Sequence, residues 1–440
     1  MKINLIKLKF SILIIIISLN GCANSESQSE YWTGYIEMNG KNVDLSLALN
    51  SENQIFSSYD LLLVEQPIRN LKINNEIITF SLVLEVELHF KGELNNDKIN
   101  GTIEMQGGPP NMNMTFNLAK QPKFPEKAYS IERLSISSKD VVLSADIYKP
   151  HTEGLHPAIV LLHGSSSNLR SDYIFYADYF VKLGFEVLIF DKRGNGESTG
   201  SYYSSSYDDL IADVTACLET MYKRKSVIKD KIGLWGLSQG ALLLSKITTN
   251  TNIPGFLIAI SPDVNSVTEA AAYSDSLRVL NLGGSEIDGK IAAESHRKVE
   301  RMLRAGNSYE QVEDFIHQNA QKYIFMNQTG LYGNINIDKN EFNGFYWQGR
   351  TEKFLSFWKN IKIPTLIIYG SRDSFVDAER NMSTLRNLNN GNIDMKLFPK
   401  ANHVLKKSFD PTNDTEFDFP RIIEGYTDYV ENWIKSEIEF

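Results

Sequence analysis

The sequence has only two cysteines, Cys22 and Cys217, among 440 residues. Two thiols can form one disulfide bond at most, so a small fold held together by several disulfide bonds is excluded. No dense block of lysine and arginine is present and the formal net charge is −9, which argues against a nucleic-acid groove. The seven histidines are scattered, with no H-E-x-x-H or C-x-x-C motif and no phosphate-binding loop. The sequence therefore predicts neither a metal nor a cofactor.

A long apolar run is also lacking at the N-terminus. The run from Phe10 to Leu19 follows basic residues and, at about ten residues, is too short to span a bilayer. This order predicts a signal peptide over 1–22. The "LNGC" sequence resembles the lipobox of bacterial lipoproteins, which implies that Cys22 is diacylated and anchors the chain in the cell envelope, on the periplasmic or outer-membrane side. The alternative is an uncleaved anchor with an incidental cysteine. Residues 23–30 are polar and are expected to form a tether.

Residues 31–120 are expected to form β-strands. Stretches such as "NVDLSLALN" alternate apolar and polar residues with period two, and turn signals such as "MNGK" and "QGGPPN" separate them. About seven or eight short strands predict a small antiparallel β-barrel or sandwich. His89 lies within one such strand and is interpreted as a solvated or hydrogen-bonded residue.

Residues 121–440 have a different hydrophobic pattern, in which near-continuous apolar runs such as "AIVLLHG" and "TLIIYG" alternate with segments of helix length. This alternation predicts a mostly parallel sheet covered on both faces. Helices are expected to begin near Ser171, Ser206, Gln239, Ala378 and Pro420. Residues from about 265 to 360 lack buried-strand runs and have helical periodicity, which predicts a helical cap insertion over one edge of the sheet.

The segment "KIGLWGLSQGALLL" places a serine between a buried strand and a buried helix. Gly236 and Gly240 permit close approach of the backbone on either side of it. This G-x-S-x-G pattern, in this context, predicts a nucleophile elbow with Ser238 as the nucleophile. The alternative is a strand-to-helix turn that merely uses a small residue.

A nucleophilic serine needs a base and an acid, which follow it in the order acid, histidine in folds with this elbow. Among the seven histidines, only His403 lies beyond both the elbow and the last candidate acid. Asp373 and Asp377 both follow the strand "TLIIYG". Asp373 is predicted to be the acid because it lies in the turn directly after the strand, whereas Asp377 is better placed to cap the next helix.

Two backbone amides are needed to bind the oxyanion. The amide of Gln239 is one candidate, and the loop "LLHGSSSN" offers the amide of Ser165 as the other. His163 is interpreted as a structural brace of that loop. In "FDKRGNGES", Asp191 and Arg193 are expected to brace the turn through ionic contacts.

Taken together, "HGSSSN", "DKRGNGES", "GLSQG", "GSRDSFV" and "NHVL" resemble the α/β-hydrolase fold. They are similar to the bacterial esterases related to dienelactone hydrolases and to the C-terminal domain of bile-acid-CoA thioesterases. The resemblance covers about residues 31–440, because some secreted members carry a similar N-terminal β-barrel. It implies a serine carboxylesterase that acts on a small-molecule ester. A thioesterase, a prolyl-oligopeptidase-like peptidase and a non-catalytic binding lipoprotein are the alternatives.

The predicted cap is rich in aromatic residues. Most of them are expected to pack the insertion onto the sheet, and some, with Trp347 as the one to test, to line an apolar acyl pocket. Small to medium uncharged acyl esters are therefore the expected substrates.

Overall fold

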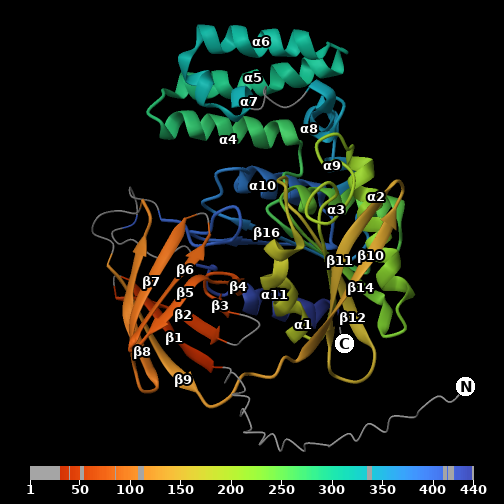
Figure 1. The fold of residues 1–440 in the computed structure, drawn as a ribbon. Coiled ribbons are helices and arrows are strands. Elements are labelled where there is room, and N and C mark those ends of the chain that lie inside the picture. Colours follow the sequence, from red (N-terminus) through yellow and green to blue (C-terminus); the bar gives the residue numbers. More distant parts are fainter. Residues whose placement is uncertain are drawn as a thin grey trace, which may run out of the picture.

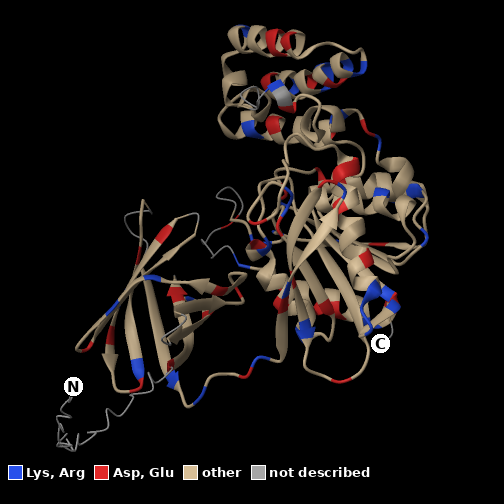
Figure 2. Cartoon of the chain, turned by 45° about the vertical axis from the view of Figure 1, so that its right-hand side comes forward, with Lys and Arg blue, Asp and Glu red and all other residues tan. Residues whose placement is uncertain are grey.

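The computed structural model describes residues 30–38, 40–49, 54–84, 86–107, 113–333, 339–409, 414 and 421–438. The predicted signal peptide, Cys22 and nearly all of the tether lie outside these residues. The described chain forms two β-sheets, one near each end of the sequence, with a group of helices standing over the second sheet (Figure 1). Basic and acidic residues are interspersed along both parts (Figure 2). Among these residues, no helix is both long enough and apolar enough to cross a bilayer.

The N-terminal sheet is an antiparallel, nearly closed, barrel-like sheet in the order β4-β3-β2-β1-β9-β8-β7-β6-β5. Its strands are β1 (Glu30–Met38), β2 (Lys41–Leu49), β3 (Gln54–Ser58), β4 (Leu63–Pro67), β5 (Arg69–Asn74), β6 (Ile77–Val83), β7 (Glu87–Asn95), β8 (Lys98–Met105) and β9 (Met114–Gln121). The alternating apolar residues form one core, in which the rings of Phe80 and Phe90 stack at 4.4 Å. The prediction of an antiparallel barrel or sandwich is confirmed as a barrel-like sheet. The described residues hold nine strands rather than seven or eight, because short, largely exposed strands such as β5 carry little alternation.

The second sheet has eight strands in the order β10-β11-β13-β12-β14-β15-β16-β17. They are β10 (Tyr129–Ser138), β11 (Val141–Pro150), β12 (His156–Leu162), β13 (Glu186–Phe190), β14 (Val227–Leu237), β15 (Phe256–Ile260), β16 (Thr365–Gly370) and β17 (Ile393–Phe398). The strands from β13 to β17 in this order are parallel, whereas β10 and β11 are antiparallel to their neighbours. Every residue of β12, β13, β15 and β16 is buried, as strands covered on both faces must be.

Helices cover both faces of this sheet. They are η1 (Arg170–Tyr173), α1 (Ile174–Lys182), α2 (Tyr207–Lys223), α3 (Gln239–Asn250), α10 (Ala378–Leu388) and α11 (Tyr426–Glu437). Along β12, Val160 and Leu162 pack with α2, α3 and α10, whereas Ile159 and Leu161 pack with α1 and α11. The helix expected near Pro420 begins instead at Tyr426, after Gly425 in the left-handed conformation with φ 79°.

The insertion between β15 and β16 is helical, as predicted, and stands above the carboxyl ends of the strands (Figure 1). It contains α4 (Val267–Asn281), α5 (Glu286–Arg304), α6 (Tyr309–Lys322), η2 (Ile324–Gln328), α7 (Gly330–Gly333), η4 (Lys339–Glu341), α8 (Phe345–Gln348), η5 (Gly349–Thr351) and α9 (Leu355–Lys359). This cap has a core of its own, and Trp347 is buried in it with 1% of its surface exposed. The structure therefore does not support Trp347 as a residue that lines an acyl pocket. The cap also buries a polar chain in which His296 bonds to Asp275 at 2.7 Å and to Arg350 at 3.1 Å.

The N-terminal sheet packs against α1. The ring of Tyr59 meets Phe175 edge-on at 5.6 Å, and its hydroxyl bonds to Lys182. Val64 on β4 joins the core cluster of α1 and α11. The backbone amide of Ile422 also donates to the carbonyl of Asp60 at 2.8 Å. The two sheets therefore share apolar and polar contacts on the face away from α2 and α3.

Candidate active site

Ser238 lies at the bend between β14 and α3. Its backbone has a positive φ of 53° with ψ −113°, a combination that is strained for a residue with a side chain. A Cβ at Gly236 would lie 2.6 Å from the carbonyl carbon of Gly240, and a Cβ at Gly240 would lie 2.7 Å from the carbonyl oxygen of His163. Only glycine fits these two positions. The bend therefore has the geometry of the predicted nucleophile elbow.

Asp373 and His403 are brought together by the ends of neighbouring strands. Asp373 follows β16 and His403 follows β17, and His403 Nδ1 lies 2.8 Å from Asp373 Oδ2. The other carboxylate oxygen of Asp373 accepts from the amides of Phe375 and Val376 at 2.8 and 2.9 Å. The side chain of Asp373 is fully buried and fixed in orientation, so its carboxylate can hold the imidazole ring with Nε2 directed away from it.

Asp377, the other acid considered, has a different place. It is the N-cap of α10, and its Oδ1 accepts from the amide of Arg380 at 3.0 Å. The helix-capping role expected for Asp377 is therefore what the structure shows.

The three residues Ser238, Asp373 and His403 share one edge of the sheet. They follow β14, β16 and β17, which are parallel and separated only by β15. The cap reaches this edge, because the hydroxyl of Tyr273 on α4 donates to the carbonyl of Asp373 at 3.2 Å. Phe375 is 52% exposed, and its ring centre is 5.1 Å from that of His403. An exposed aromatic ring next to a candidate base is suited to contact an apolar part of a substrate.

The loop after β12 passes directly beside the elbow. A Cβ at Gly164 would lie 3.9 Å from the Cβ of Ser238. Next to it, His163 Nε2 donates to the carbonyl of Phe190 at 2.6 Å, and Gly164 donates its amide to the Tyr173 hydroxyl at 3.0 Å. Burial and the nearby Lys192 ammonium lower the pKa of His163 to about 3. This histidine is neutral and braces the loop, in keeping with the structural role expected for it. Ser165 follows Gly164 in the same loop.

Gln239 begins α3 and is buried. Its side-chain oxygen accepts from the Tyr202 hydroxyl at 3.0 Å and from Lys192 Nζ at 3.3 Å. Sequence reasoning did not single out Lys192, Tyr202 or Phe375. Lys192 and Phe375 lie inside the "DKRGNGES" and "GSRDSFV" segments. The only sequence feature that could have indicated a role for them is that they are close to Asp191, Arg193 and Asp373.

The turn after β13 is held by ion pairs, as expected from the sequence, but its two charged residues do not pair with each other. Asp191 pairs with Arg170 at 2.5 Å. Arg193 forms a bidentate salt bridge with Asp213 on α2, with Nε–Oδ2 and Nη2–Oδ1 distances of 2.6 and 2.8 Å. Both turn residues are therefore tied to elements that flank the sheet.

Replacing Arg193 with methionine is expected to lower the free energy of unfolding by about 3–5 kcal/mol, because it leaves the Asp213 carboxylate buried without a partner. Chemical denaturation measures the change. Lys223→Met is the control, since Lys223 makes an exposed pair with Glu219 at 3.5 Å and should have a much smaller effect. Equal effects of the two substitutions would contradict the structural role of the Arg193–Asp213 pair.

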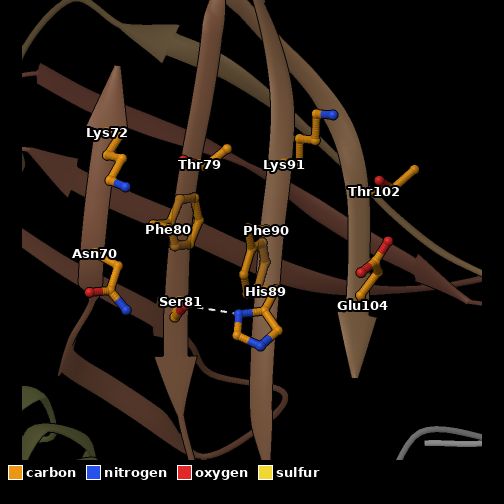
Figure 3. A pocket seen from close by; sticks show the side chains of 10 residues that line it. All are labelled: Asn70, Lys72, Thr79, Phe80, Ser81, His89, Phe90, Lys91, Thr102 and Glu104. Carbon is orange, nitrogen blue, oxygen red and sulfur yellow. Dashed lines mark hydrogen bonds between the residues drawn. The ribbon is translucent and has the colours of Figure 1, made fainter. Parts of the chain in front are cut away.

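A shallow groove of about 290 Å³ lies on the N-terminal sheet, away from Ser238 (Figure 3). Polar residues of β5 to β8 line it together with Phe80 and Phe90. Ser81, His89 and Glu104 lie opposite one another on three neighbouring strands. His89 Nδ1 bonds to the Ser81 hydroxyl at 3.0 Å, in keeping with its interpretation as a hydrogen-bonded histidine. Within the described ranges, no group of three or more histidine, cysteine or acidic residues is arranged to hold a metal ion.

Comparisons with known proteins show what this chain is similar to. Residues 157–408 match the model of a family described as alpha/beta hydrolase fold. Esterase EstD of Thermotoga maritima is 21% identical over 391 residues, which cover 86% of this chain and 85% of that enzyme. Quorum-quenching protein AidA of Acinetobacter baumannii is 26% identical over 161 residues. This alignment covers 36% of this chain and about half (53%) of the length of that relative. The solved structure of the Pyrococcus furiosus esterase Pf2001 aligns with 70% of this chain, and the alignment covers 92% of the Pf2001 chain. The sequence identity is 18% and the TM-score is 0.44. Since the family model covers more than half of the sequence, this chain belongs to the α/β-hydrolase fold family.

Proposed function

We propose that the protein is a serine hydrolase that cleaves carboxylic esters of small to medium acyl groups through Ser238, His403 and Asp373. The observation that carries the proposal is the 2.8 Å bond between His403 and a buried Asp373, at the sheet edge where Ser238 occupies a strained elbow. The similarity to Esterase EstD over most of both chains supports ester hydrolysis. The finer assignment is to the esterases related to dienelactone hydrolases.

In the proposed reaction, His403 Nε2 removes the proton of the Ser238 hydroxyl as its oxygen attacks the acyl carbon. Asp373 holds the imidazole in the tautomer that leaves Nε2 free, and stabilises the imidazolium that forms. The amides of Ser165 and Gln239 bind the oxyanion, and the N-terminus of α3 favours its negative charge. His403 then protonates the departing alcohol, and water releases the acid from the acyl-enzyme by the same steps.

The proposed substrate class rests on the surroundings of His403. The exposed ring of Phe375 offers an apolar surface next to the base, and the cap contacts the same edge of the sheet through Tyr273. Apolar surface with few polar groups suits an uncharged acyl chain better than a peptide.

The proposal is tested by fluorophosphonate labelling, followed by a panel of acyl esters, thioesters and amides with one acyl group. Labelling at Ser238 with the fastest turnover on esters supports it. Faster turnover of thioesters or amides would make the protein a thioesterase or a peptidase instead. A folded protein that is neither labelled nor active would be the non-catalytic binding lipoprotein.

The proposed location is the bacterial cell envelope, through a lipid on Cys22, which lies outside the described residues. Cys22→Ser is expected to move the protein from the membrane fraction to the soluble fraction, because two acyl chains anchor a protein stably. Labelled fatty acid in the expressing bacterium measures the modification. Cys217→Ser is the control, since Cys217 is fully buried and should not affect labelling. Undiminished labelling of Cys22→Ser would rule out the lipobox interpretation.

A further inference from the structure

The ammonium group of Lys192 is buried among neutral groups beside the candidate site. Only 4% of this residue is exposed. Nζ donates to the carbonyl oxygens of Gly164 and Ser166, the second at 2.9 Å, and to the side-chain oxygen of Gln239 at 3.3 Å. It also lies 4.0 Å from the centre of the Tyr202 ring. Every one of these partners is uncharged.

Burying a lysine in this way is costly. No carboxylate in the described part of the chain forms an ion pair with Lys192, and burial alone lowers its pKa to about 7. Cations in protein interiors are normally paired, because removal from water disfavours the charged form. A function at this position would account for the retention of an unpaired ammonium group.

The bond to Gly164 has a specific geometric consequence. The carbonyl of Gly164 and the amide N–H of Ser165 belong to the same planar peptide group, in which they point in opposite directions. Anchoring the carbonyl on Lys192 therefore fixes the direction of the Ser165 N–H, away from the ammonium. The same peptide lies beside the elbow, because a Cβ at Gly164 would be 3.9 Å from that of Ser238.

Lys192 also contacts the residue that carries the other proposed donor amide, Gln239. Its bond to the Gln239 side chain ties the first residue of α3 to the loop that carries Ser165. One ammonium group thus connects the two segments whose amides are assigned to the oxyanion. When it is protonated, its positive charge polarises the Gly164 carbonyl, and this strengthens the N–H on the other side of the same peptide as a donor.

We propose that Lys192 is the positioning residue of the oxyanion hole, which it builds by fixing the Gly164–Ser165 peptide and the Gln239 side chain. This inference rests on the proposed ester hydrolysis. Lys192 does not touch the substrate; it acts through the two amides. The expected size of its effect is that of losing one oxyanion donor, about a hundredfold in kcat.

The test compares Lys192→Met, Lys192→Gln and Lys192→Arg on one ester substrate. The Met variant should lose about a hundredfold in kcat with KM changed less than about threefold, because the oxyanion forms only during reaction. The inhibition constant of a boronic acid that mimics the tetrahedral intermediate should rise in step with the loss of kcat/KM. Lys192→Gln should fall between Met and wild type, and Lys192→Arg should recover most of kcat because it restores the positive charge.

Arg224→Met is the matched control. Arg224 is a partly buried cation at the opposite end of the sheet, bonded to Glu186 at 2.5 Å and to Glu132 at 2.9 Å. It should lower thermal stability and leave kcat within about twofold, because it does not reach the oxyanion loop. The inference is wrong if Lys192→Met lowers kcat no more than this control, or if Arg fails to exceed Met in kcat. If Lys192→Met does not fold, Lys192→Gln takes its place: the inference is then wrong if Lys192→Gln lowers kcat no more than Arg224→Met, or if Lys192→Arg fails to exceed Lys192→Gln in kcat.

The inference and the proposed function fail in different ways. If the wild-type enzyme is labelled at Ser238 and hydrolyses esters, but Lys192→Met is unimpaired, only the inference about Lys192 is wrong. A wild-type protein that neither labels nor hydrolyses esters removes both.

Discussion

Ser238→Ala is expected to lower kcat for ester hydrolysis by roughly five orders of magnitude, because it removes the atom that forms the acyl-enzyme. The remaining rate would come from the oxyanion donors and substrate binding. The fold should persist, because alanine meets the same backbone strain at φ 53° as serine does. Steady-state kinetics on an activated ester and a thermal unfolding curve measure the two effects.

Ser130→Ala provides the matched control for this substitution. Ser130 is exposed on the edge strand β10, at the end of the sheet opposite Ser238. It should retain full activity and full reactivity toward a fluorophosphonate. Hydrolysis by Ser238→Ala at near wild-type rate would show that another residue is the nucleophile.

Asp373→Asn is expected to lower kcat by about 10⁴-fold, because an asparagine at this position favours the histidine tautomer that cannot accept the serine proton. Asp377→Asn should leave kcat and stability close to wild type, since asparagine caps a helix about as well as aspartate does. Both substitutions replace a carboxylate oxygen by an amide nitrogen, at positions four residues apart, so each is the control for the other. A larger loss of kcat in Asp377→Asn would reverse the assignment of the acid.

Much of the architecture could be predicted from the sequence, because the signals are local. Continuous apolar runs identified the strands of the second sheet, and chain order together with placement after successive strands selected Ser238, Asp373 and His403. The elements that differed have weak local signals. β5 is mostly exposed and scarcely alternates, and α11 begins after a glycine turn at residue 425 rather than near the expected proline.

The surroundings of the site could not be predicted in the same way, because they depend on contacts between distant segments. Lysine in a polar loop is usually solvated, and nothing near Lys192 in the sequence indicates burial. Its environment arises when Gly164, Tyr202 and Gln239 converge on it. Trp347 shows the opposite case, since an aromatic residue in the cap gives no sign of whether it faces a pocket or, as here, the interior of the cap.

The cap is a single excursion of the chain between two hydrogen-bonded neighbours, leaving the sheet after Ile260 and returning at Thr365. The entropy of closing such an excursion grows slowly, by about 0.6 kcal/mol for each doubling of its length. The cap has a core of its own, and it also joins the sheet, because Phe345, Phe354 and Trp358 belong to the core of the second sheet and Tyr273 bonds to the carbonyl of Asp373. Insertions and deletions in the loops between the cap helices are therefore expected to cost little stability, provided that these contacts are kept.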